Sequence, residues 1–134
     1  MTSVLVLPDE SWTDRDAVLA GITGAVDVRG GFATEICADV LRLSPAPPVI
    51  VVAHGTGCAA LPALALAQRT AHRRIGAYVL VEPDAPASSD TWPDAPVFVV
   101  TDDEHRARLC ALRGWTVSNR GVRETVALAV AESD

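Results

Sequence analysis

The run Val49-Ile50-Val51-Val52 constrains the fold of this chain more than any other feature. It is uninterrupted, apolar and rich in β-branched residues, and it follows a break at residues 45–48, which hold three prolines. Such a run is typical of a strand buried on both faces of a parallel sheet, because helices then cover both sides of it. We therefore expect a central strand here, between two layers of helices.

Shorter apolar runs alternate with helical patterns along the rest of the chain. The other predicted strands lie at Val4 to Leu7, Ala25 to Val28, Ala77 to Val81, Val97 to Val100 and Trp115 to Ser118. Apolar residues at helical spacing separate them, as with Ile36, Val40 and Leu43. This alternation predicts parallel pairing with right-handed crossovers. The expected fold is α/β, a three-layer sandwich with a mostly parallel sheet.

Length and charge limit the functions to consider. The 134 residues fit a single domain, residues 1–134, that folds alone or as a homo-oligomer. The net charge is −6, and the longest basic cluster is Arg73-Arg74, so neither nucleic acid nor a membrane surface is an expected partner. No membrane span or secretory signal is expected either.

The cysteines and the absence of known binding motifs indicate reduced thiols and a protein without a metal or cofactor. Cys37, Cys58 and Cys110 are an odd number and widely spaced, which favours reduced thiols and a cytoplasmic location. The CxxC, HExxH, P-loop and GxGxxG patterns are absent from the sequence. We therefore expect no metal and no cofactor.

Sites in open parallel sheets lie beyond the carboxyl ends of the strands. In this chain the segments at those ends are Asp9 to Trp12, His54 to Cys58, Glu82 and Asp84, Asp102 to His105, and Asn119-Arg120. These segments are expected to meet in one crevice.

The segment VIVVAHGTGCAALPALALA resembles the strand, nucleophile elbow and helix of the α/β-hydrolase family. Downstream, GAYVLVEP resembles the family's next strand, and PVFVVTDDEH resembles the strand whose loop carries its acidic residue. The resemblance covers most of the chain. It implies a small, truncated member of the family that lacks a lid domain.

The sequence departs from that family at its two most reactive positions. Ala53 and Gly57 supply the small residues that an elbow requires, but Gly55 falls on the nucleophile. The loop in which the family has its histidine base reads Ser118-Asn119-Arg120-Gly121. The resemblance therefore implies no Ser-His-Asp mechanism, although the backbone N–H groups of the elbow can still bind a carbonyl or carboxylate.

The predicted catalytic residues are Asp102, Asp103 and His54. Asp102 or Asp103 matches the family's acidic residue, with Glu82 or Asp84 after the previous strand as the alternative, and the two aspartates also fit an acidic first turn that complements a helix dipole. His54 lies beside the elbow, where it is either a proton shuttle or a packed structural histidine.

The predicted substrate-binding residues surround these candidates. They are Ser11, Trp12, Gly55, Thr56, Cys58, Glu82 and His105. Cys58 is either a nucleophile activated in the first turn of a helix or a small residue chosen for packing. Thr56 is either a replacement nucleophile or a helix cap.

Two functions follow from this pattern. The first is an enzyme that acts on a small acyl or carbonyl compound by acid–base chemistry without a serine nucleophile, as a lyase, isomerase, cyclase or hydrolase. The alternative is a non-catalytic descendant of a hydrolase that binds a ligand or another protein. The fold alone does not choose between them.

Overall fold

The computed structural model describes residues 2–84 and 92–133. The strands are β1 (Ser3–Val6), β2 (Ala25–Asp27), β3 (Val49–His54), β4 (Ile75–Val81), β5 (Val97–Val100) and β6 (Thr116–Ser118). The helices are α1 (Arg15–Gly21), α2 (Ala33–Leu43), α3 (Leu61–Thr70), α4 (Glu104–Leu112) and α5 (Val122–Ser133), and η1 (Gly55–Ala60) is a 3-10 helix. The predicted alternation of strands and helices is confirmed.

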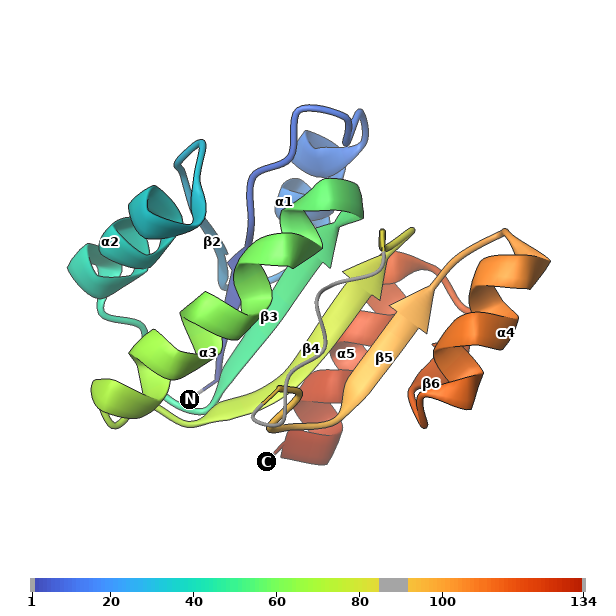
Figure 1. The fold of residues 1–134 in the computed structure, drawn as a ribbon. Coiled ribbons are helices and arrows are strands. Elements are labelled where there is room, and N and C mark those ends of the chain that lie inside the picture. Colours follow the sequence, from blue (N-terminus) through green and yellow to red (C-terminus); the bar gives the residue numbers. More distant parts are fainter. Residues whose placement is uncertain (1, 85–91, 134) are drawn as a thin grey trace.

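The strands form one parallel sheet in the order β2-β1-β3-β4-β5-β6 (Figure 1). After β2 the chain returns past β1 and continues outward on the other side with β3, so the order reverses between β1 and β3. At such a reversal the connections leave neighbouring strands in opposite directions, which opens a crevice at the carboxyl ends. This topology places the end of β1 beside the end of β3.

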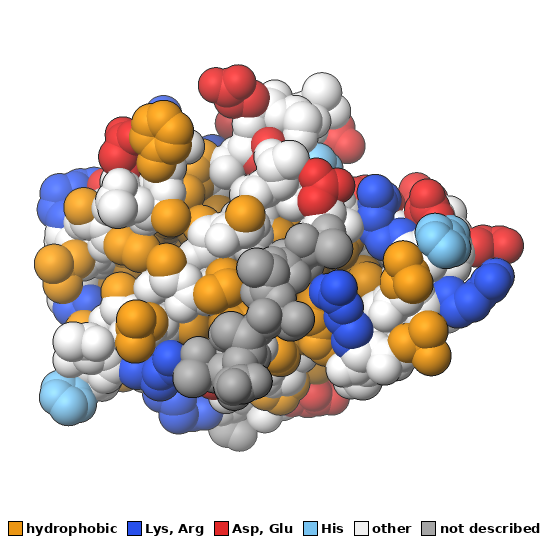
Figure 2. Space-filling view, viewed as in Figure 1, with side chains coloured by type: hydrophobic (Ala, Val, Ile, Leu, Met, Phe, Trp, Pro, Cys, Tyr) orange, Lys and Arg blue, Asp and Glu red, His pale blue; other side chains and the backbone are white. Residues whose placement is uncertain are grey.

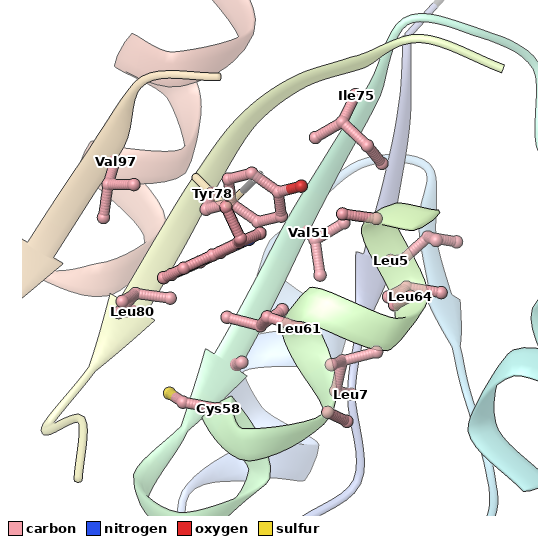
Figure 3. Close-up of a cluster of buried hydrophobic side chains, with 14 of the residues drawn as sticks. Leu5, Leu7, Val51, Cys58, Leu61, Leu64, Ile75, Tyr78, Leu80 and Val97 are labelled. Carbon is pink, nitrogen blue, oxygen red and sulfur yellow. The ribbon is translucent and has the colours of Figure 1, made fainter. Parts of the chain in front are cut away.

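Helices cover both faces of the sheet (Figure 1). One core lies between the sheet and the helices α2 and α3, and includes Tyr78, Val51, Leu61 and Leu64 (Figure 3). The second core lies on the opposite face, where α5 contributes Val126 and Ala129. The α/β class, the parallel pairing and the two helical layers agree with the expectation from sequence.

The central strand behaves as its sequence predicts. Residues 49–53 of β3 are all fully buried, because β1 and β4 flank the strand and helices cover both faces. Beyond β3 the chain makes the 3-10 turns of η1 before α3 begins, and Pro62 lies in the first turn of α3. A proline is tolerated there because that N–H has no partner within the helix.

Two features of the helices differ from what sequence patterns commonly indicate, namely the capping of α1 and α2 and the burial of leucines on α4. The residue before α1 is Asp14 and the residue before α2 is Phe32, and neither caps its helix through a side chain. Leu109 and Leu112 of α4 share a helical spacing, yet they are 50% and 80% exposed. Helix α4 lies near the edge strand β6, so less of its surface is covered than that of a central helix.

Candidate functional site

Two polar side chains meet where the strand order reverses. Asp9 follows β1 and His54 is the last residue of β3, and these two strands are neighbours in the sheet. The Oδ2 atom of Asp9 lies 2.6 Å from the Nδ1 atom of His54, although the residues are 45 positions apart in the chain. The crevice expected at the carboxyl ends therefore contains an Asp–His pair.

Hydrogen bonds favour the charged form of Asp9. Burial raises the pKa of Asp9, but hydrogen bonds from His54 and Ser11 outweigh it and leave the pKa below that of an ordinary aspartate. Asp9 is thus a carboxylate that only accepts hydrogen bonds, so Nδ1 of His54 is the donor between the two side chains. The other ring nitrogen, Nε2, has no hydrogen-bond partner among the described residues.

Ser11 and Trp12, both predicted from sequence, contact the pair. The hydroxyl of Ser11 donates to Asp9 Oδ2 over 3.0 Å, and its backbone N–H donates to Asp9 Oδ1 over 3.2 Å. The rings of Trp12 and His54 stack with centroids 5.1 Å apart and planes 7° from parallel. Ser11 thus holds the carboxylate, while Trp12 and Asp9 together set the plane of the imidazole.

Gly55 makes the turn from β3 into η1. Its φ is +53°, in the left-handed region that glycine adopts most easily. A Cβ at this position would lie 2.9 Å from Asp9 Oδ2 and 3.5 Å from Ser11 Oγ. The side of Gly55 that would carry a nucleophile faces the carboxylate of Asp9.

The exposed Thr56 follows and makes no side-chain hydrogen bond with a described residue.

Cys58 lies in the core and is not exposed. Burial, with a smaller contribution from the negative charges of Asp84 and Asp9, raises the pKa of its thiol to about 12. A thiol with that pKa is protonated near neutral pH and is a poor nucleophile. The structure favours the packing role of Cys58, beside Leu61 and Leu80 (Figure 3).

The other predicted residues form a separate network at the end of β4. Glu82 accepts hydrogen bonds from the hydroxyl of Thr101, the backbone N–H of Asp102 and the guanidinium of Arg106, at 2.8, 2.7 and 2.6 Å. These hydrogen bonds outweigh a partial burial that raises the pKa of Glu82, and the pKa is lowered overall. Glu82 thus joins β4 to the loop before α4.

Asp103 and His105 belong to the start of α4. The carboxylate of Asp103 caps the helix by accepting a hydrogen bond from the backbone N–H of Arg106 over 3.0 Å. Asp103 and His105 also line a cavity of about 230 Å³ beside Pro83, and Asp102 is exposed. These side chains make no hydrogen bond to Asp9 or His54, so the predicted catalytic residues Asp102 and Asp103 are not joined to His54.

Asp9 was not among the residues singled out from sequence, although the segment that it begins was placed in the crevice. The available signal is its position two residues after a short apolar strand, directly after Pro8. Its pairing with His54 depends on β1 and β3 being neighbours, which hydrophobic patterns do not reveal.

Among the described residues, no group of three or more His, Cys, Asp and Glu side chains is arranged to hold a metal ion. The helices in the same part of the chain are all too short or too polar to cross a membrane. No protein-family model, curated protein or solved structure matches this chain. The resemblance to the α/β-hydrolases therefore stays a prediction from sequence motifs.

Proposed function

We propose that the protein is an enzyme that moves a proton on a small acyl or carbonyl compound, with Nε2 of His54 as the base. The observation that carries this proposal is the 2.6 Å contact between Asp9 Oδ2 and His54 Nδ1 at the reversal of strand order. A carboxylate that holds one imidazole nitrogen leaves the opposite nitrogen ready to accept a proton and stabilises the imidazolium that forms.

The roles of the neighbours follow from their contacts. Asp9 sets the tautomer of His54, Ser11 holds Asp9, and Trp12 keeps the imidazole ring in plane. The backbone N–H groups at the start of η1 are the natural donors for the substrate carbonyl oxygen, because the first N–H groups of a helix have no partner within it. This scheme needs no serine nucleophile, in agreement with a truncated hydrolase scaffold whose elbow residue is Gly55.

One observation favours the alternative, a ligand-binding domain without catalysis. The side chains of Asp9 and His54 are only 4% and 16% exposed. A pair so well covered can also serve to fasten the end of β1 to the end of β3. The two functions differ in whether His54 changes a bond in the bound molecule.

Turnover by variants of the pair tests the proposal. A panel of ketones, thioesters and p-nitrophenyl esters is screened for exchange of the α-proton in deuterated water and for release of product. We expect His54→Gln to lose any activity that the screen finds by roughly 10² to 10⁴-fold. The matched control is His72→Gln, an exposed histidine in the turn after α3. Equal activity of the two variants would leave the binding function as the better account.

A further inference from the structure

A groove of about 620 Å³ opens beside Asp9 on the face covered by α2 and α3. Its walls come from three places, the loop after β1, the start of α2, and η1. The apolar lining side chains are Pro8, Phe32, Ala33, Ile36, Ala59 and Ala60. A volume of this size is typical of small-molecule sites, which are commonly between about 300 and 1,000 Å³.

Close backbone contacts fix the shape of the groove. A Cβ on Gly30 would lie 2.9 Å from the backbone nitrogen of Ile36, and the φ of Gly30 is +138°. A Cβ on Gly57 would lie 3.1 Å from the carbonyl oxygen of Pro8. The loop before α2 is therefore packed on the first turn of that helix, and η1 is packed on the loop after β1. Neither glycine has room for a side chain without a shift of the neighbouring backbone.

The charges around the groove have one sign. Asp9 and Glu10 are the only charged side chains among the described residues that line it. Glu35, in the first turn of α2, stands at its edge, with Oε1 3.6 Å from where a Cβ of Gly31 would be. Glu35 also offsets the positive end of the helix dipole. In Figure 2 hydrophobic side chains gather over α2 and α3, and several acidic side chains stand at the upper edge of this face.

Asp9 is paired with His54, but the other two carboxylates have no such partner among the described residues. Neither Glu10 nor Glu35 has an ion pair with any described residue. Two arginines of the neighbouring segments, Arg15 and Arg29, both pair with Asp27, each over 2.6 Å, and neither lines the groove. Arg15 also donates to three backbone carbonyls through its Nε and Nη2 atoms. Among the described residues, the groove combines apolar walls with the unpaired carboxylate of Glu10, and the unpaired carboxylate of Glu35 stands at its edge.

We propose that this groove binds a small molecule that carries an ammonium group beside a short apolar chain. Glu10 attracts the ammonium group, while Phe32 and Ile36 contact the chain. This inference rests on the proposed function only where it takes the bound molecule to be the substrate of His54. The substrate class is then an amine-bearing acyl or carbonyl compound, and molecules with a carboxylate or phosphate in place of the amine are rejected.

Three probes with the same chain test the charge preference. Pentylamine, pentanamide and pentanoate are titrated into the labelled protein at low salt, and the backbone amide signals are followed by NMR. We expect pentylamine to shift the signals of Gly31, Thr56 and Gly57, and to bind about two- to fivefold more tightly than pentanamide, with pentanoate the weakest. Added salt should reduce the preference, because the groove is open to solvent.

Matched variants locate the binding. Glu10→Gln should reduce the preference for pentylamine, whereas Glu124→Gln, on α5, should leave it unchanged. Ala59→Leu should block the groove for all three probes. Ala63→Leu makes the same change at an exposed site on α3 outside the groove, and should leave binding intact.

The inference is overturned if pentanamide or pentanoate binds as well as pentylamine, if no probe shifts these signals, or if Ala59→Leu leaves binding unaffected. Because these measurements need no turnover, they fail independently of the proposed function. If the probes bind in the expected order and His54→Gln is fully active, the groove is an amine site and His54 has no role in proton transfer. If His54→Gln loses activity and no amine binds, His54 keeps its role and the groove is not an amine site.

Discussion

The Asp9 carboxylate occupies the space in front of Gly55, where a Cβ would lie only 2.9 Å from Oδ2. The site therefore depends on residue 55 having no side chain. A serine at this position would have to displace the group that holds His54. The glycine at position 55 and the Asp–His pair are therefore two aspects of one arrangement.

The first prediction concerns the stability of this contact. Gly55→Ala combines the strain of a positive φ with a close approach to Asp9, whereas Gly24→Ala has the strain alone, because its φ is +76° and nothing lies within 4 Å of its Cβ position. We expect Gly55→Ala to lower the free energy of unfolding by about 1–3 kcal/mol more than Gly24→Ala does. Urea unfolding of both variants measures the difference. Equal losses would show that Asp9 moves aside without cost.

The central part of the fold could be read from the sequence, and the pairing within the site could not. The apolar run of Val49 to Val52 predicts a buried parallel strand, and the structure confirms it. The same run predicts that His54 and Gly55 belong to the site, because they lie at the carboxyl end of this strand. The partner Asp9 could not be predicted in this way. Its contact with His54 depends on the order of the strands in the sheet, which is set by the packing of loops and helices and leaves no periodic pattern in the sequence.

A second prediction concerns serine-directed probes. Ser11 is the serine in contact with the pair, and its hydroxyl donates to the Asp9 carboxylate instead of to His54. A carboxylate with a lowered pKa is a weak base and does not activate a hydroxyl. We expect no labelling by a fluorophosphonate, measured by intact mass beside a serine protease labelled in parallel. Stoichiometric modification of Ser11 would make it the nucleophile and overturn this reading.

The third prediction follows from the burial of Cys58. With a pKa raised to about 12 and no exposure, its thiol should resist iodoacetamide at pH 8 in the folded protein and react after unfolding in urea. Peptide mapping by mass spectrometry distinguishes Cys58 from the half-buried Cys37. Cys58→Ala should reduce stability by roughly 1 kcal/mol through lost packing and leave activity unchanged. Rapid labelling of native Cys58 would restore the thiol mechanism.

The fourth prediction is a dependence of stability on pH that involves Glu82. Its hydrogen bonds lower its pKa in the folded state, so the stabilisation is present above the unfolded value of about 4.3 and is lost as the pH falls through the folded pKa. We expect Glu82→Gln to be less stable than the wild type at pH 7, and the two unfolding curves to converge as the pH falls below about 4. Glu124→Gln serves as the control. A difference that stays constant with pH would rule out the ionised Glu82 as its source.

The last prediction decides which carboxylate supports catalysis. In Asp9→Asn the amide can donate to His54 Nδ1, which would move the ring proton to Nε2 and remove the base, so kcat/KM should fall by roughly 10² to 10⁴-fold. Asp103→Asn keeps a good helix cap, because asparagine and aspartate are about equally effective there. Asp102→Asn changes an exposed side chain. Both should keep activity within a few-fold of the wild type, measured on the substrate that the screen identifies, with folding checked by thermal melting. If Asp103→Asn loses as much activity as Asp9→Asn in a folded protein, the acid–base group lies at the start of α4, and the contact between Asp9 and His54 is structural.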